Sequence, residues 1–129
     1  MKLEIIREWV FKAEEDYFAL EILARQRKKR IYDIICFHSQ QCAEKYLKAL
    51  LVFHECSPPK SHDLSRLSDL LKSQEPAVIL MIDLCERLTP YGVEFRYPGE
   101  EATAQEAKMA VAAAKEIRRF VRARLKLSK

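Results

Sequence analysis

Glycine and proline occupy only a few places in this chain, and their positions constrain the fold more than any other feature. The first 57 residues contain neither, and both glycines, Gly92 and Gly99, lie in one short stretch. The five prolines, at 58, 59, 76, 90 and 98, stand between periodic segments and not inside them. An all-β domain needs many tight turns, which these residue types supply. The pattern therefore predicts an all-α fold.

Size and composition are those of a globular protein. The chain has 129 residues, 49% of them hydrophobic and 33% charged, which is far from the core-poor composition of disordered chains. Since a chain of about 150 residues buries roughly 70% of the surface it would expose unfolded, we expect one domain spanning 1–129. No run approaches the ~20 apolar residues of a membrane span. No membrane association is expected.

The cysteines and the amino terminus both indicate a cytoplasmic protein. Cys36, Cys42, Cys56 and Cys85 form no CxxC pair, and three of them lie in apolar helical patterns where a free thiol behaves as a small hydrophobe. The first nine residues include charged side chains and so do not read as a signal peptide. We expect reduced thiols and cytoplasmic localisation.

Hydrophobic periodicity predicts about five helices, packed as an up-and-down antiparallel bundle. The first covers about 2–26, with Phe18 or Tyr17 as alternatives for one core position, and the second runs from a cap at Asp33 to about 54. A short helix follows a cap at Asp63, a fourth covers about 76–89 behind Pro76, and the last opens with a capping box. That box is formed by Thr103 and Glu106.

The second predicted helix has a wide apolar arc and one narrow polar arc. The wide arc is typical of a central helix that touches several neighbours. The polar arc, Gln41, Glu44, Lys45 and Lys48, can line a groove in which lysines contact phosphate and Gln41 reads a base edge or ribose. It can equally be a solvated face, with Glu44 and Lys48 as an i,i+4 pair worth only about 0.3–0.5 kcal/mol.

Residues 89–102 form the one long predicted loop, and loops of this length are often functional. Within it, Arg96 could fork onto phosphate oxygens while the ring of Tyr97 stacks on a base. Alternatively, Arg96 pins its own loop to a helix carboxylate. Both interpretations remain open on the sequence.

His62 precedes a predicted helix start, where backbone amides and an imidazole could hold an anion. It could instead complete the cap or pack under the preceding prolines. Together with His54 and Cys56 it offers only three metal ligands without paired spacing, so we expect no metal and no cofactor. His62 and Arg96 are the weak candidates for catalysis.

Positive charge gathers in two places although the net charge is only +4. Arg25, Arg27, Lys28, Lys29 and Arg30 lie between the first two predicted helices, and residues 115–129 hold seven Lys or Arg against one Glu. These are two candidate anion-facing patches, and RNA binding is open. Cations near a helix carboxyl end are also expected from the helix dipole.

Four pieces in order resemble the HEPN domain family: the first helix with Trp9, Ala13 and Asp16, then CFHSQQCAEKYLKALL at 36–51, SHDL at 61–64 and FRYPG at 95–99. The resemblance implies an up-and-down helical bundle, commonly a homodimer, often working beside a minimal nucleotidyltransferase. Many members are metal-independent ribonucleases whose signature is an Arg followed four to six residues later by His. Here that spacing is absent, because the closest approach, Arg30 to His38, has seven intervening residues.

We therefore expect a non-catalytic HEPN domain that binds a nucleotide, a nucleotidyltransferase partner or both, in the manner of a toxin–antitoxin pair. The binding residues expected from the sequence are Gln41, Lys45, Lys48, His62, Arg96 and Tyr97. A first alternative is a metal-independent ribonuclease with a displaced site, in which His62 is the acid or base and Arg96 stabilises the phosphate. A second is a structural subunit whose basic ends dock an acidic partner.

Overall fold

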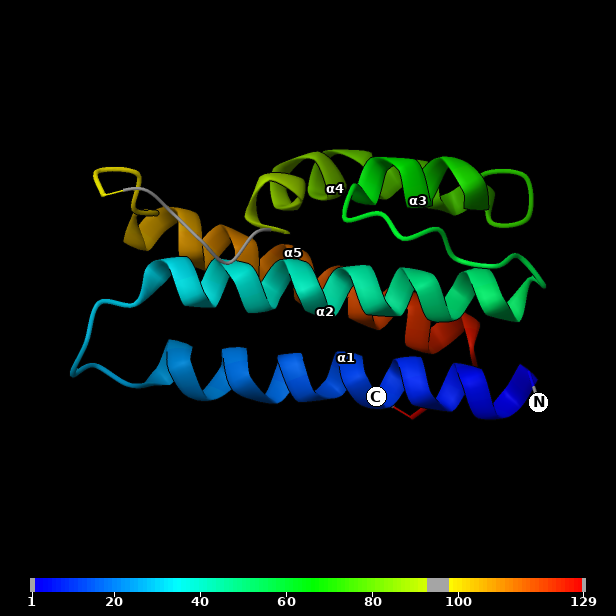
Figure 1. Cartoon of the computed structure of the whole chain (residues 1–129), viewed down its shortest axis with the longest axis horizontal. Helices are drawn as coiled ribbons and strands as arrows, with labels where there is room; N and C mark the ends of the chain where they lie inside the picture. Colours follow the sequence, from blue (N-terminus) through cyan, green and yellow to red (C-terminus); the bar gives the residue numbers. More distant parts are fainter. Residues whose placement is uncertain (1, 93–97, 129) are drawn as a thin grey trace.

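The computed structural model describes residues 2–92 and 98–128, and these residues form helices and connections without a strand. Figure 1 shows α1 and α2 lying antiparallel, with α3 and α4 on the other side of α2 and α5 packed behind it. The all-α prediction is confirmed. The elements are α1 (Lys2–Arg25), α2 (Tyr32–Phe53), α3 (Leu64–Leu71), η1 (Pro76–Met81), α4 (Ile82–Leu88), η2 (Thr89–Gly92) and α5 (Ala104–Arg124), where η marks a 3₁₀ helix.

Helix α2 is the centre of the bundle. It packs against α1, α3 and α5, and also meets α4 and η2. Tyr46, Leu47 and Leu50 on this helix have no exposed surface. The wide apolar arc thus serves several neighbours at once, as the sequence predicts, because each neighbour covers a different sector of the helix.

Helix α1 is covered on one side only. Ala13 and Leu20 are fully buried, and Tyr17 packs partly buried against the core. Phe18 is 68% exposed, so Tyr17 is the correct one of the two alternatives for that core position. The reason is geometric: residue 18 lies about 100° further round the helix, beyond the sector that α2 and α5 cover.

Two of the predicted helix starts are confirmed. The Asp63 carboxylate accepts hydrogen bonds from the amides of Ser65 and Arg66 at the start of α3. Thr103 and Glu106 form the reciprocal capping box of α5. Each satisfies backbone donors that have no partner within the helix.

The predicted cap at Asp33 is wrong. Helix α2 begins at Tyr32 behind Ile31, which contributes no side-chain cap. The Asp33 carboxylate lies in the first turn and accepts a hydrogen bond of 2.7 Å from the Ala102 amide. A contact across 69 residues has replaced a local one, which local sequence pattern cannot reveal.

The predicted fourth helix is two elements. Pro76 does occupy its first turn, but residues 76–81 form η1 before α4 continues the chain. Val78, Met81, Cys85 and Leu88 are buried, as expected. Ile79, expected in the same apolar set, is 55% exposed, because a 3₁₀ turn has three residues per turn and rotates it away from the core.

The structure also tests the predictions for the cysteines, for a membrane span and for Met109. The four cysteines are free thiols, and Cys36, Cys42 and Cys85 are buried. Within residues 2–92 and 98–128, no helix combines the length and apolar character needed to cross a membrane. Met109, expected in the α5 core set, is instead partly exposed.

Candidate functional site

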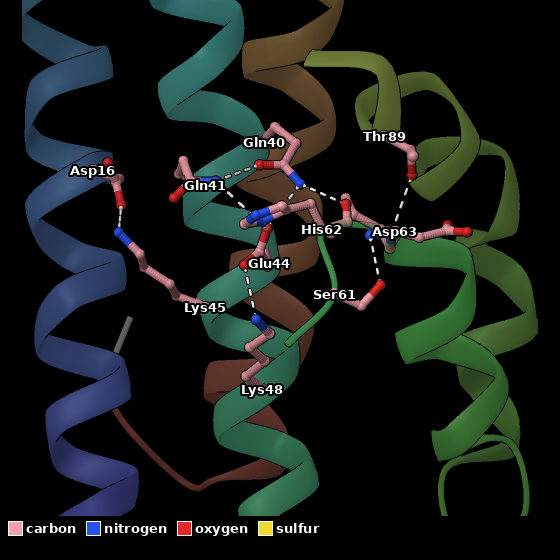
Figure 2. A network of polar contacts seen from close by, with 11 residues as sticks. Asp16, Gln40, Gln41, Glu44, Lys45, Lys48, Ser61, His62, Asp63 and Thr89 are labelled. Carbon is pink, nitrogen blue, oxygen red and sulfur yellow. Dashed lines mark hydrogen bonds and ion pairs between the residues drawn. The ribbon is translucent and has the colours of Figure 1, made fainter. Parts of the chain in front are cut away.

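Two carboxylates inside the bundle each hold one histidine and one lysine. Asp16 of α1 pairs with His38 and Lys45, and Glu44 of α2 pairs with Lys48 and His62. We call these two groups together the polar cluster, and Figure 2 shows most of it between α1, α2 and the start of α3. Every buried side-chain oxygen and nitrogen among the described residues has a hydrogen-bond partner.

The Asp16 half joins α1 to α2. The carboxylate is 2.7 Å from Nδ1 of His38 and 2.6 Å from Nζ of Lys45. Asp16 is nearly buried, so the two α2 residues replace the water that would otherwise solvate its charge. Lys45 therefore already has a close carboxylate partner.

The Glu44 half joins α2 to the segment before α3. Its carboxylate is 2.9 Å from Nζ of Lys48 and 2.9 Å from Nδ1 of His62, and it accepts a further bond from Gln40 at 3.1 Å. Burial alone would raise the pKa of Glu44, but the hydrogen bonds from Lys48, His62 and Gln40 outweigh burial and lower it. Glu44 is therefore held as a carboxylate.

Gln40, like Asp16 and His38, is a member of this site that was not among the binding residues expected from the sequence. It is fully buried, donates to the His62 carbonyl at 2.9 Å and accepts from Gln41 at 2.8 Å. The end of η2 packs against it: a Cβ on Gly92 would lie 3.1 Å from Gln40 Nε2. An amide inside an apolar arc was the available signal, since a buried amide must find partners.

The structure brings four of the six expected binding residues together. Gln41, Lys45, Lys48 and His62 all belong to this neighbourhood. The solvated-face interpretation of the polar arc is wrong, because the side chains of Glu44 and Lys48 are only 5% and 7% exposed. The other two expected residues, Arg96 and Tyr97, lie outside the described residues.

His62 combines a fixed ring with an open edge. Its Nδ1 faces Glu44, while 66% of the side chain is exposed. Asp63 performs the capping of α3, so the expectation that His62 completes the cap is wrong. A carboxylate that orients one ring nitrogen and leaves the other accessible is an arrangement suited to proton transfer or to hydrogen bonding with a ligand.

A groove lies beside the cluster between α1 and α2. This α1–α2 groove is a hollow of about 360 Å³ lined by Ile5, Glu8, Trp9, Lys12 and Lys45. Lys48 Nζ lies 5.5 Å from the centre of the Trp9 ring, which links the groove to Glu44 and through it to His62. Among the described residues, Lys12 forms no ion pair.

A second cluster, built on Glu14, ties α5 to the bundle. Arg118 donates two hydrogen bonds to Glu14, of 2.7 and 3.0 Å, and also lies over the Tyr17 ring. Tyr46 donates to the same carboxylate and accepts from Arg122 at 3.0 Å. Burial would raise the pKa of Glu14, but the hydrogen bonds from Arg118 and Tyr46 lower it.

These contacts change the interpretation of the basic carboxyl-terminal patch. Arg118 and Arg122 are engaged with Glu14 and Tyr46, and Arg124 is 2.8 Å from Glu75. Glu75 also holds His54 at 2.7 Å. In the part of the chain that the structure describes, no group of three or more His, Cys, Asp or Glu side chains is arranged to hold a metal ion.

The fold and the site define an all-α bundle domain organised around an internal polar cluster of its two longest antiparallel helices. A family model for the HEPN domain matches residues 6–124. The chain belongs to the HEPN domain family.

Solved structures add support for the fold. The crystal structure of TT1696 from Thermus thermophilus is similar, with a TM-score of 0.75 and 23% sequence identity. The match covers 90% of this chain and 94% of that one. No curated protein matches the sequence. The likeness to TT1696 concerns the fold alone.

Proposed function

We propose that this protein is a non-catalytic HEPN domain that binds a nucleotide in the α1–α2 groove and acts together with a minimal nucleotidyltransferase. The observation that carries the proposal is the groove itself, where the Trp9 ring and the ammonium of Lys12 line one hollow. An aromatic ring can stack on a base, and a lysine can hold a phosphate as a point charge.

The charges of the groove favour a ligand with few phosphates. Lys45 is held by Asp16 at 2.6 Å and Lys48 by Glu44 at 2.9 Å. Lys12 is the lining lysine that has no such partner among the described residues. One ring and one lysine without an ion pair match one base and one phosphate group, and the carboxylate of Glu8 in the same lining opposes further negative charge, so a nucleoside monophosphate is the expected form.

The non-catalytic assignment rests on the sequence, and the polar cluster has a structural role of its own. The Arg and His spacing of the family's ribonucleases is absent from the whole chain. The histidines within the cluster, His38 and His62, are each held by a carboxylate. Both contacts join separate segments of the chain, which is the role of a structural clamp.

Thermal melting with and without nucleotide tests the groove. A ligand that binds only the folded state at ten times its Kd stabilises by about 1.4 kcal/mol. For a domain of this size that is a rise of several degrees in Tm. We expect this rise with AMP or GMP for the native protein and for Lys72→Gln, whose lysine lies on α3's exposed end paired with Asp69. Lys12→Gln and Trp9→Leu should lose it.

Each protein's shift is measured against its own ligand-free Tm, so a loss of stability by itself cannot imitate a loss of binding. The absence of a shift for the native protein at millimolar nucleotide would reject nucleotide binding. An equal shift in Lys12→Gln would reject the groove as its place. The first result would favour the purely structural subunit, and the second would mean that the nucleotide binds elsewhere on the protein.

The outer face of α1 supports association with another chain. Phe11, Phe18 and Ile22 are 63%, 68% and 50% exposed and follow each other at spacings of seven and four. We propose that a second copy covers this face. An antiparallel pairing of two α1 helices places Phe11 against Phe18 of the second copy and Glu4 beside Arg25, because both pairs are centred on the same point of the helix.

Sedimentation velocity tests the homodimer. Phe18→Glu buries a charge in the proposed interface and should give a monomer, whereas Phe53→Glu, on a partly exposed phenylalanine of α2, should leave the dimer intact. A native protein that stays monomeric at millimolar concentration would contradict the pairing. Mixing each form with a minimal nucleotidyltransferase and measuring complex size then tests that partner separately.

A ribonuclease remains the second candidate because of the Glu44 and His62 pair. A carboxylate at 2.9 Å from Nδ1 leaves Nε2 of an exposed imidazole as a possible base or acid. Incubation with transfer RNA in EDTA tests this function. Cleavage that disappears in both His62→Ala and Arg96→Ala, while His54→Gln still cuts, would replace the binding proposal by the enzyme. If the native protein at micromolar concentration cleaves no RNA, the ribonuclease candidate is rejected.

A further inference from the structure

The connection between α1 and α2 carries a second hollow, distinct from the α1–α2 groove. It has a volume of about 620 Å³ and is lined by Leu23, Ala24, Arg25, Gln26, Arg27, Lys29, Arg30, Tyr32 and Ile35. Four of these side chains are cationic and none is a carboxylate. Such a lining concentrates positive potential in one concave place.

The cations of this hollow are not neutralised by close ion pairs within the described part of the protein. Arg27, Lys29 and Arg30 are exposed and form no ion pair among the described residues. Arg25 is 3.9 Å from Glu21, a weak contact for a side chain that is 79% exposed. This differs from the carboxyl-terminal patch, where Arg118 and Arg124 are held by glutamates.

The turn that presents these cations is organised by one side chain. Gln26 Oε1 accepts from the amides of Lys28 and Lys29, both at 3.1 Å, and its Nε2 donates to the Lys29 carbonyl at 2.8 Å. These bonds fix the backbone of a turn that contains neither glycine nor proline. Compensation of the α1 dipole needs a cation in the last helical turn, which Arg25 supplies. It does not explain the three further cations that line the hollow, Arg27, Lys29 and Arg30.

The positive end of α2 adds to the same potential. Helix α2 starts at Tyr32 behind Ile31 and lacks a side-chain cap, so its amino-terminal amides are not covered by a side-chain oxygen at the cap position. The acidic residue of that first turn, Asp33, is directed to the Ala102 amide. The dipole of this 22-residue helix adds positive potential beside the basic turn, and the Asp33 carboxylate in the first turn offsets part of it.

An apolar floor continues from the basic hollow. A neighbouring hollow of about 290 Å³ shares Ala24, Tyr32 and Ile35 with it and extends to Lys108 of α5. Phosphate contacts are thus available at the basic turn and at Lys108, with a half-buried tyrosine ring between them. This alternation of cations and a ring is the arrangement that accommodates successive phosphates and an unpaired base.

We propose that the basic turn and its apolar floor bind the phosphodiester backbone of a single-stranded nucleic acid. Arginine forks contact phosphate oxygens, and a base lies on the surface around Tyr32. A duplex fits less well because its bases are paired and stacked and cannot reach the tyrosine. This site is separate from the proposed nucleotide groove and does not depend on it.

Fluorescence anisotropy with a labelled single strand of about ten nucleotides, RNA or DNA, in EDTA at low salt tests the proposal. Arg27→Gln with Arg30→Gln removes two cations of the site. Arg66→Gln with Arg87→Gln removes two exposed arginines of α3 and α4 and gives the same net charge. We expect at least tenfold weaker binding for the first pair and less than twofold for the second.

The salt dependence supplies an independent readout. Losing two phosphate contacts should reduce the slope of log K against log salt by about 1.4, since each contact on a single strand contributes about 0.7. The control pair should keep the native slope. If both pairs of substitutions weaken binding equally, net charge alone explains the effect and the proposed site is wrong. The proposal is also wrong if the native protein does not bind the strand at about 20 mM salt.

Two further arms identify the ligand and separate this site from the groove. Gln26→Ala keeps every charge but loses the bonds that shape the turn, and we expect severalfold weaker binding; unchanged affinity would overturn the role of the turn. Lys12→Gln should bind the strand normally. Displacement of the strand by ATP or polyglutamate at equal anion concentration would assign the site to a free nucleotide or an acidic protein and reject the single strand.

Discussion

The pair of Glu44 and Lys48 should contribute far more to stability than its spacing on a helix suggests. An exposed i,i+4 pair is worth about 0.3–0.5 kcal/mol. Here the two charged atoms are 2.9 Å apart and the side chains are 5% and 7% exposed. Removing one partner of a buried pair leaves the other charge without compensation, at a cost of about 3–5 kcal/mol.

Glu44→Gln should therefore lower the free energy of unfolding by about 3–5 kcal/mol, because the Lys48 ammonium stays buried without a carboxylate. Lys48→Met should cost less, since Glu44 keeps its bonds to His62 and Gln40. The double variant should cost less than the sum of the two by more than about 1.5 kcal/mol. Guanidinium denaturation followed by fluorescence of Trp9, the single tryptophan, measures all three.

A matched pair on the surface serves as the control. Asp69 and Lys72 are also 2.9 Å apart, but their side chains are 64% and 48% exposed. The cycle of Asp69→Asn and Lys72→Met should give a coupling below about 0.5 kcal/mol. If the Glu44 and Lys48 coupling is no larger than this, burial does not strengthen the pair and our reasoning on the polar cluster is wrong.

Three further predictions concern other contacts. Because folding lowers the pKa of Glu14, its carboxylate stabilises the fold above the pKa of the unfolded chain, and this stabilisation is lost as pH falls. Glu14→Gln should therefore flatten the decline, from pH 6 to about 3, in the free energy of unfolding measured with urea. An unchanged decline would contradict this. Asp63→Ala should cost about 1 kcal/mol in the same assay and Asp63→Asn almost nothing, whereas equal losses would exclude capping. Gly92→Ala should lower Tm, at a cost of about 1–3 kcal/mol, because its Cβ meets Gln40 and His62; a raised Tm would show that these side chains yield.

Several elements could be predicted from the sequence because their causes are local. Asp63 and the pair of Thr103 and Glu106 cap helices through bonds to amides two or three residues away, so a short pattern contains the whole interaction. The wide apolar arc of α2 likewise indicated a central helix from periodicity alone. Asp33 is the instructive failure, since its partner is 69 residues distant.

The sequence could predict part of the candidate site, but it could not show whether those residues are buried or paired. The arc of Gln41, Glu44, Lys45 and Lys48 was recognisable by spacing. Whether it faced water depended on Asp16 of α1 and His62 before α3, which approach it from 29 and 18 residues away. Gln40 was passed over because its partners are the His62 carbonyl and Glu44, and only folding brings that carbonyl within reach.

The sequence by itself determined that this protein is helical, where most of its helices begin and which helix is central. It also determined which polar residues share an arc. Each of these follows from helix propensity, capping or periodicity within one segment. Only the tertiary structure decided that Glu44 and Lys48 are buried and that Trp9 and Lys12 line a hollow. It also decided that Arg118 and Arg124 pair with glutamates, whereas Arg27 and Arg30 form no ion pair among the described residues. The physical reason is that desolvation and charge pairing depend on neighbours in space, and those neighbours come from distant parts of the chain.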